Sequence, residues 1–490
     1  MAVPMVEVLG VEEELEEESQ DWVPLLHTPP GGRAPRPLYP VAEQPWPPAL
    51  LSFLEARGVA RARPLQALLW AAAARLQSVV AVAPSTSSEG QGKTLGWLLP
   101  TIAHLAAEPL LPPGPGPRLV VLCSGVAAVT AAAALVEQVA VAARLHLAVV
   151  QDCAGVREVE ATQFINGVDV LVSTPPRLLE RLGRGSYRVT GLERCCHLVV
   201  EEADIVLRRW QGETSTLLST WREERGMAGQ LLVLASSWTP ELATLTSATL
   251  PTVIMTSMLE AAVYSGLTIL PTFATADPEQ ELGRRMVEVV RGATGRVVVC
   301  CRDTTTAHLL ATRLGDQEVR VVEGEEQWEV SARVLVVPDP HLPPAPPPLP
   351  TTAHLTMVHW DLPAGKAAFD RRFRLLRGTV RSLVQPEAEV VPAEVHLLLR
   401  PEDAPSLQTV VPLVERCGGQ VPEELAVYQA GVVRARERTQ PLCDALVKVS
   451  VCYHTLENNF PLVRPSPFLY CVRLSVRPFV TPKKEACIGC

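Results

Sequence analysis

The chain has 490 residues, enough for two or three domains that each bury a hydrophobic core. Hydrophobic residues make up 47% of it and the net charge is −9, which excludes a disordered chain and a globally basic protein that coats nucleic acid. No apolar run reaches the roughly 18 residues of a membrane-spanning helix, and the N-terminus lacks the pattern of a secretory signal. We therefore expect a cytoplasmic protein with reduced cysteines and no membrane partner.

The first 45 residues are acidic and then rich in proline. Residues 12–18, EEELEEE, carry six carboxylates, and the stretch PPGGRAPRPLYP follows further on. Such composition does not supply enough apolar surface for a core. We interpret residues 1–45 as a solvated tail.

From residue 46 to 256, short apolar runs alternate with amphipathic segments such as residues 126–145. This pattern is typical of βαβ units on a parallel sheet that is covered on both faces. The strands expected in this part are 78–83, 118–123, 145–150, 168–173, 197–202 and 231–236.

A second series of strands and helices is expected from residue 257 to 402. The strands expected here are 296–301, 318–323, 332–338, 355–361 and 394–400. Residues 338–352 contain too many prolines for a central strand and predict an extended surface loop. The predicted fold is therefore α/β with two parallel-sheet lobes, followed by a small C-terminal region at 403–490.

The strongest chemical signal is the segment 87–94, SSEGQGKT, which lies between an expected strand and an expected helix. Glycines let backbone N–H groups approach a phosphate, and the helix N-terminus adds positive potential. Lys93 would reach the β- and γ-phosphates of ATP, and the Thr94 hydroxyl would bind Mg²⁺. The full phosphate-loop pattern fails at Ser87, and a helix start that happens to read GKT is the alternative. The other predicted ATP-binding residues of the segment are Ser88, Glu89, Gly90, Gln91 and Gly92.

Two carboxylates, Glu201 and Glu202, leave the expected strand 197–202 together, about a hundred residues after Lys93. A phosphate-loop site requires an acidic residue at the end of a neighbouring strand to hold Mg²⁺ and orient water. We predict that both are catalytic and that Glu201 is a Mg²⁺ ligand. The alternative is an ordinary charged strand end.

Taken together, these motifs resemble the DEAD-box RNA helicase family. Residues 201–204, EEAD, resemble its DEAD tetrapeptide, and further elements follow in the family's order. The resemblance implies two RecA-like lobes that bind ATP, Mg²⁺ and RNA. It assigns adenine recognition to Gln66 and coupling between the lobes to Ser236 and Ser237. The residues that it assigns to RNA binding are Gly155, Thr174, Pro175 and Arg177.

The sequence also departs from the family's pattern. Glu201 stands where the family has aspartate, and Leu375 occupies the position of the arginine finger. An arginine finger contributes roughly 10³–10⁵ in rate, so we expect ATP binding with doubtful or slow hydrolysis. The alternative is a pseudo-helicase scaffold that closes on RNA or protein partners without turnover. The predicted phosphate- and RNA-binding cluster, with a solvated helix face as its alternative, consists of Arg371, Arg372, Arg374 and Arg377.

The C-terminal region is similar to that of the Tudor domain-containing protein 12 family within this group. It carries VPEEL at 421–425 and QAGV at 429–432, then Cys443 and Cys452 at the spacing of half a CCCH zinc finger. The second half is absent, so we do not expect zinc. This resemblance implies a role in the germline piRNA pathway, in transposon silencing and cytoplasmic germ granules, with PIWI-class partners. A Tudor domain is not recognisable, as expected of a fragment or short isoform.

Overall fold

The computed structural model describes most of the chain from residue 34 to 439. The described residues are 6–7, 24–29, 34–83, 90–107, 116–153, 167–183, 191–249, 253–315, 318–324, 332–342, 354–363, 365–383 and 390–439. Site predictions that lie outside these ranges concern Ser87, Ser88, Glu89, Gly155, Cys443 and Cys452. Most of the proline-rich insertion also lies outside them.

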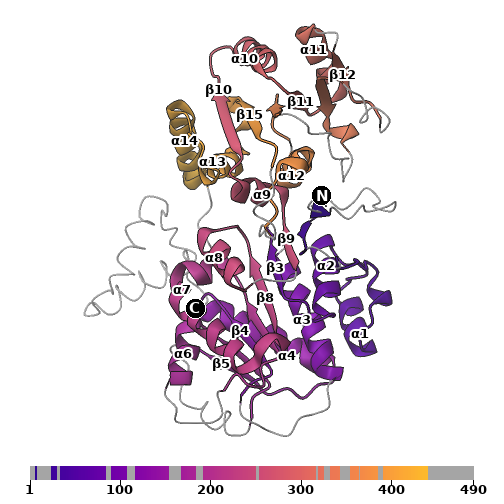
Figure 1. Ribbon diagram of the computed structural model, residues 1–490, viewed down its shortest axis with the longest axis vertical. Helices are drawn as coiled ribbons and strands as arrows, with labels where there is room; N and C mark the ends of the chain where they lie inside the picture. Colours follow the sequence, from indigo (N-terminus) through magenta and orange to yellow (C-terminus); the bar gives the residue numbers. More distant parts are fainter. Residues whose placement is uncertain are drawn as a thin grey trace, which may run out of the picture. The chain divides into compact units, whose positions relative to one another are not determined.

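The first part of the chain is built around a nine-stranded sheet, which we call lobe 1 (Figure 1). Seven neighbouring strands pair in parallel, and the N-terminal strands extend the β9 edge in antiparallel fashion. In spatial order the strands are β1 (Val6–Glu7), β2 (Leu25–His27), β9 (Val253–Thr256), β3 (Val79–Val82), β8 (Gln230–Ala235), β7 (His197–Val200), β4 (Leu119–Leu122), β6 (Val170–Ser173) and β5 (Val149–Asp152).

Helices cover both faces of this sheet. Alternate strand residues point to opposite faces, so Val79 and Ala81 pack with one set of helices while Val80 and Val82 pack with the other. The first set comprises α1 (Pro48–Ala56), α2 (Pro64–Ala73), α3 (Gly90–Ala107) and α4 (Val126–Ala142). The second comprises α6 (Pro175–Gly183), α7 (Ala203–Arg225) and α8 (Pro240–Thr249).

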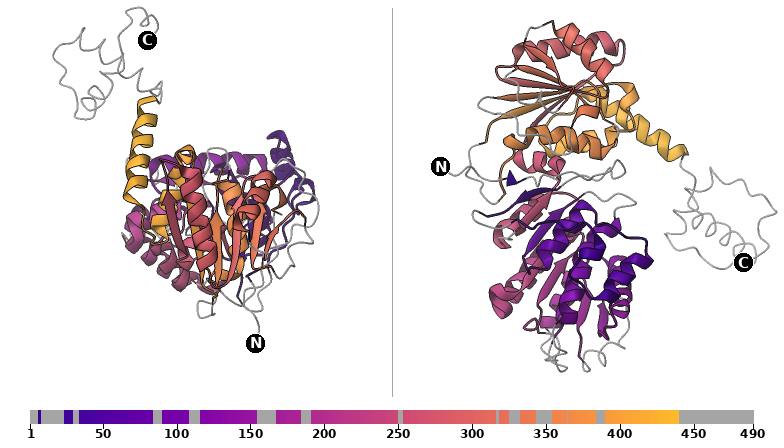
Figure 2. Two further views of the ribbon diagram at one scale, coloured as in Figure 1. Left: turned by 90° about the horizontal axis from the view of Figure 1, so that it is seen from above. Right: turned by 90° about the vertical axis from the view of Figure 1, so that its right-hand side faces the viewer.

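A six-stranded, fully parallel sheet forms lobe 2, and helix α9 (Met258–Ser265) precedes it. Its strands in spatial order are β10 (Thr268–Phe273), β15 (Ala393–Leu399), β14 (Leu355–His359), β11 (Arg296–Cys301), β13 (Val334–Pro338) and β12 (Val319–Val321). Helices α10 (Pro278–Gly292) and α11 (Thr304–Leu314) pack on one face (Figure 2). The remaining helices are α12 (Lys366–Phe373), which continues into the 3₁₀ helix η5 (Arg374–Thr379), and α13 (Leu407–Arg416).

A second unit, Glu423–Cys490, contributes one described helix, α14 (Glu423–Thr439). None of the helices in the described ranges combines the length and hydropathy that a membrane span requires.

The predicted α/β class with two parallel-sheet lobes is confirmed, and each strand expected from the sequence is present, although β5 begins at Val149 and not at residue 145. Four further strands, β1, β2, β9 and β10, were not predicted, and the shortest of them, β1, has only two residues. Strand β10 contains Pro271, which a sheet tolerates at its edge, where β10 lies. Strand β9 is only four residues long and β2 only three, too short for a clear pattern.

The interpretation of residues 1–45 as a solvated tail implied that this segment stays outside the lobe. Part of the segment instead belongs to lobe 1. Strand β2 pairs with β9, and Leu26 belongs to the core of lobe 1. His27 is fully buried, and its Nε2 lies 2.7 Å from the Tyr264 hydroxyl. Burial lowers the pKa of His27 to about 3. These residues are therefore part of the folded lobe.

A buried histidine predicts how the stability of lobe 1 depends on pH. His197 Nδ1 lies 2.8 Å from Gln230 Oε1, and Nε2 lies 3.0 Å from His104 Nδ1. Burial lowers the pKa of His197 to about 4. The unfolded chain takes up this proton below about pH 6.5, so stability is lost as pH falls from there toward 4, by roughly 3 kcal/mol.

Urea denaturation of lobe 1 at several pH values measures this dependence. We expect His197→Gln to reduce the slope, to which the buried His27 still contributes, while the same change at the exposed His308 leaves the slope as it was. An unchanged slope in His197→Gln contradicts the assignment to His197.

Candidate nucleotide-binding site

Lys93 lies in the first turn of α3, at the carboxyl edge of the lobe 1 sheet. Its Nζ donates to the Ala83 carbonyl at 2.7 Å and to Ser236 Oγ at 2.9 Å. Ala83 follows β3 and Ser236 follows β8, and these two strands are neighbours in the sheet. The first turn of α3 contains no acidic residue. The ammonium and the positive helix end therefore lie together, as a phosphate-binding site requires.

Glu201 follows β7 and contacts two residues of α3. Its carboxylate accepts hydrogen bonds from the Thr94 hydroxyl and, at 2.5 Å, from Trp97 Nε1. Burial raises the pKa of Glu201, and these two hydrogen bonds oppose that rise. A hydroxyl and a carboxylate side by side are oxygen ligands of the kind that Mg²⁺ prefers. The donor set therefore fits the predicted ion.

Mg²⁺ at nucleotide sites is usually bound by one or two protein groups together with phosphate oxygens and water. Within the described ranges there is no cluster of three or more His, Cys, Asp or Glu side chains that could hold a metal ion by itself. The pair Thr94 and Glu201 agrees with a site in which two protein groups bind Mg²⁺ together with phosphate oxygens and water.

The turn after Glu201 is joined to the end of β8. Ser236 N donates to Asp204 Oδ1 at 3.1 Å, and Ser237 Oγ donates to Asp204 Oδ2 at 3.3 Å. Ser236 also accepts from Lys93. Of the two predicted coupling residues, Ser236 thus contacts both Lys93 and Asp204, and Ser237 contacts Asp204.

Glu202 precedes α7 in a left-handed conformation, with φ 49° and ψ 46°. Left-handed backbone at a residue other than glycine is uncommon and collects at functional sites. The Ser124 hydroxyl donates to the Glu202 carboxylate, and Arg209 Nη1 donates to the Ser124 carbonyl at 2.7 Å. The exposed Glu202 carboxylate is thereby held beside Glu201 at the edge of the sheet.

Gln66 lies in α2 with its amide directed at the start of α3. Its Oε1 accepts from Arg63 N at 3.0 Å, and its Nε2 donates to the Gly92 carbonyl at 3.4 Å. The residue is buried. Gln66 thus touches the phosphate-binding turn, and its role in adenine recognition stays a prediction.

The predicted RNA-binding arginine of lobe 1 is engaged in ion pairs. Arg177 Nε lies 2.9 Å from Asp152 Oδ1, and Nη1 lies 2.7 Å from Glu180 Oε2. Arg181 binds the same fully buried Asp152. Pro175 is buried and Thr174 half-buried at the start of α6. Contact of these residues with RNA stays a prediction. Such contact would require Arg177 either to release Asp152 or to bind RNA while it remains paired with Asp152.

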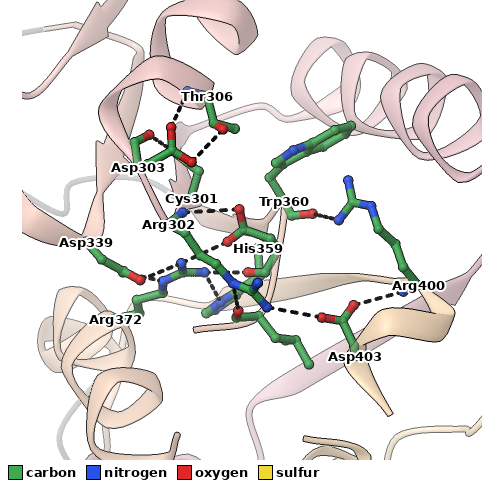
Figure 3. A network of polar contacts seen from close by, with 12 residues as sticks. Cys301, Arg302, Asp303, Thr306, Asp339, His359, Trp360, Arg372, Arg400 and Asp403 are labelled. Atoms are coloured by element: carbon green, nitrogen blue, oxygen red, sulfur yellow. Dashed lines mark hydrogen bonds and ion pairs between the residues drawn. The ribbon is translucent and has the colours of Figure 1, made fainter. Parts of the chain in front are cut away.

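Arg372 is the centre of a polar network at the carboxyl edge of the lobe 2 sheet (Figure 3). Its guanidinium is fully buried and lies 2.6 and 2.9 Å from the Asp339 carboxylate oxygens. It also lies 3.0 Å from Asp361 Oδ1. Burial opposes the charge, but the bonds to Asp339 and the nearby acidic groups raise the pKa of Arg372.

The network continues through Arg302 to the end of β15. Arg302 N donates to Asp361 Oδ2 at 3.1 Å, and its Nη2 lies 3.5 Å from Asp403 Oδ1 (Figure 3). Arg400 Nη1 donates to the Trp360 carbonyl at 2.6 Å. Four strand ends are thus held together by charged groups.

Two arginines of the predicted cluster, Arg372 and Arg374, are engaged in ion pairs inside lobe 2, and their contact with phosphate or RNA stays a prediction. Arg374 is buried and lies 3.4 Å from Asp370, so both guanidinium groups are used inside lobe 2. Helix α12 gives way to η5 within this segment, so the arginines do not share one solvated face. Arg371 and Arg377 are half-buried and stay candidates for phosphate or RNA contact.

Sequence reasoning missed several residues of these sites. Trp97 follows Thr94 by three residues, a spacing that places both on one helix face. Asp339 and Asp361 each follow an apolar strand of one parallel sheet, which places them at one edge. Both signals were present in the sequence. Nothing local indicated Arg302, because its acidic partners lie about 60 and 100 residues away.

Comparison with known proteins finds a family match for the part of the chain that contains Lys93, Thr94 and Glu201. Residues 63–256 match the family model described as DEAD/DEAH box helicase. The chain is 31% identical over 219 residues to the ATP-dependent RNA helicase dbp2 of Aspergillus oryzae, covering 44% of this chain and 37% of that protein. It is 28% identical over 276 residues to dbp2 of Schizosaccharomyces pombe, covering 55% and 48%. The chain thus spans less than half the length of these relatives.

Solved structures include similar chains. The RNA helicase Prp28 from Chaetomium thermophilum bound to ADP has a TM-score of 0.43 and 19% identity, over 82% of this chain and 94% of its own. The yeast DEAD-box splicing factor Prp28 has a TM-score of 0.43 and 17% identity, over 83% and 93%. Residues 63–256 are thus similar to the DEAD/DEAH box helicase family, as both the family match and the sequence relatives show.

Proposed function

We propose that the chain binds ATP, Mg²⁺ and RNA as a DEAD-box RNA helicase-like protein whose ATP hydrolysis is slow. The carrying observation is the position of Lys93, whose ammonium lies between the ends of β3 and β8. Thr94 lies on the same helix start as Lys93, and its hydroxyl donates to the Glu201 carboxylate at the end of β7. A lysine, a helix N-terminus and oxygen ligands together are what a nucleoside triphosphate with its metal needs.

In this proposal Lys93 exchanges its present partners for the β- and γ-phosphates, and Gln66 contacts adenine. Thr94 and Glu201 hold Mg²⁺, which neutralises charge on the phosphate oxygens when bound. Glu202 orients the attacking water. When the Lys93 ammonium moves from Ser236 to a phosphate, the Ser236 hydroxyl loses this hydrogen bond. This change supports the predicted role of Ser236 in coupling nucleotide binding to the second lobe.

Slow hydrolysis follows from Leu375, which stands at the arginine-finger position and is 1% exposed. Restoring arginine there by Leu375→Arg is expected to yield no gain in RNA-stimulated hydrolysis over the unchanged chain, because a guanidinium at that place enters the core. We expect it to destabilise lobe 2 by roughly 3–5 kcal/mol, the usual cost of an uncompensated buried charge. Phosphate release and the urea midpoint measure the two effects. Leu375→Met is the control and should cost less than about 1.5 kcal/mol. New RNA-stimulated turnover in Leu375→Arg would contradict the expectation.

The proposed function is tested by ATP binding and phosphate release of the unchanged chain, with and without single-stranded RNA. Binding of ATP with slow release that RNA accelerates supports a helicase-type ATPase. Binding without release supports the second candidate, a nucleotide-gated scaffold, which the buried Leu375 favours. Absence of nucleotide binding overturns both.

We also propose that the chain acts in the cytoplasm of germ cells, in granules of the piRNA pathway, together with PIWI-class proteins. The support is the sequence VPEEL followed by QAGV, the latter within helix α14. Immunoprecipitation of the tagged chain from germ cells tests this. Recovery of PIWI-class proteins and piRNA precursors is the expected result, and their absence, with efficient recovery of the chain, contradicts it.

A further inference from the structure

Trp97 directs the polar atom of its side chain at a predicted Mg²⁺ ligand. The residue is fully buried, and Nε1 donates to Glu201 Oε1 at 2.5 Å. Trp97 follows Thr94 by three residues on α3, so the two side chains lie on one face of the helix. Helical side chains lean toward the helix N-terminus. Trp97 therefore reaches from the second turn of α3 toward the phosphate-binding turn.

The bond matters because of the length of the Glu201 side chain. Glutamate has one more rotatable bond than the aspartate of the family, so its carboxylate can occupy more positions in its accessible rotamers. A buried indole N–H requires an acceptor, and a buried carboxylate requires donors. The contact satisfies both groups and fixes one carboxylate oxygen, while the Thr94 hydroxyl is a second donor.

We propose that Trp97 is a positioning residue for Mg²⁺, which holds the Glu201 carboxylate beside the Thr94 hydroxyl so that the pair is ready for the metal of a bound nucleotide. The inference rests on the proposed nucleotide binding. Trp97 touches neither nucleotide nor metal and acts through Glu201. Residues that orient a metal ligand in this way typically contribute 10- to 100-fold to metal affinity.

Trp97→Phe removes the indole N–H and keeps an aromatic ring. We expect the Mg²⁺ concentration that half-maximally strengthens ADP binding to rise about 10- to 100-fold, while ADP binding in EDTA changes less than about twofold. Isothermal titration of the full chain with ADP over a series of Mg²⁺ concentrations measures both. A rise confined to the Mg²⁺-dependent part supports positioning, because loose packing alone would weaken binding in EDTA as well.

Trp221→Phe is the matched control. Trp221 is also fully buried in lobe 1, and its Nε1 donates to the Cys195 carbonyl at 2.9 Å, on the helix layer of the other face. Trp221→Phe therefore removes the same indole N–H group from a similarly buried position. We expect its Mg²⁺ requirement to equal that of the unchanged chain, and an equal rise in both variants would overturn the inference.

A double-mutant cycle separates action through Glu201 from a general effect. Glu201→Gln should raise the Mg²⁺ requirement by itself, and Trp97→Phe should add less than about twofold in that background. Full additivity would mean that Trp97 does not act through Glu201 and would overturn the inference.

Glu201→Asp keeps the charge and restores the family's residue, so it tests the contact if Trp97→Phe does not fold. Shortening the side chain withdraws the carboxylate from the indole, and we expect a higher Mg²⁺ requirement although the residue now matches the family. A lower or unchanged requirement contradicts positioning by Trp97. If the unchanged chain does not bind ADP at all, the proposed function fails and the inference with it; ADP binding with an unaltered Mg²⁺ requirement in the variants overturns the inference alone.

Discussion

Lys93→Ala is expected to weaken binding of Mg²⁺-ADP by roughly 10- to 150-fold, corresponding to about 1.5–3 kcal/mol for hydrogen bonds to a charged group. The reason is the place of its ammonium between the ends of β3 and β8. Isothermal titration measures the affinity. ATP should be affected at least as strongly, because Lys93 is proposed to contact the β- and γ-phosphates.

Lys93→Arg is the control for this prediction. It keeps the positive charge but replaces a compact ammonium with a planar, longer group. We expect its affinity for Mg²⁺-ADP to lie between that of the unchanged chain and that of Lys93→Ala. Loss of the Ala83 and Ser236 contacts also affects folding, so the urea midpoint of each variant is compared first. Undiminished ADP binding by folded Lys93→Ala would mean that the nucleotide, if bound, lies elsewhere.

Arg372→Met is expected to destabilise lobe 2 by roughly 3–5 kcal/mol, because the change leaves two acidic partners beside each other without their cation. Arg372 is fully buried between Asp339 and Asp361 (Figure 3). Burial already raises the pKa of Asp361, and Arg372 is the main group that opposes this rise. Without the guanidinium, one of the two carboxyls must become protonated or the strand ends must separate.

Urea denaturation followed by amide exchange in β13 and β14 reports the stability of lobe 2 separately from lobe 1. Arg371→Met, one residue earlier on the same helix and half-buried, is the matched control and should change the stability by less than about 0.5 kcal/mol. Equal losses of stability in the two variants would show that the bonds of Arg372 to Asp339 and Asp361 do not stabilise lobe 2.

The Arg372 network and the Lys93 site differ in how far the sequence reveals them. The carboxylates at 201–202 were recognised because they directly follow an apolar strand, and Lys93 and Thr94 because their segment lies between an apolar strand and a helix. Their mutual contacts, and the contact of Lys93 with Ser236, agree with that expectation. Segments 84–89 and 154–166 lie outside the described residues, so the remainder of the phosphate loop stays a prediction.

The sequence by itself determined the two α/β lobes and predicted the place of the candidate nucleotide site. Strands such as β3, β4 and β7 are buried on both faces and therefore read as continuous apolar runs. The phosphate-binding segment is local as well, because its backbone and its lysine are contiguous in the chain. Information of this kind needs no knowledge of distant contacts.

Only the tertiary structure decided which charged side chains are available at the surface. Arg372 and Arg177 look like ligand-binding arginines in the sequence, yet the first is buried among carboxylates and the second is paired with the buried Asp152. The addition of β2 to the lobe 1 sheet and the burial of Leu375 were likewise invisible. The physical reason is common to all four: the partners lie on strands and helices distant in the chain, and exposure depends on what packs against a side chain, which local composition does not record.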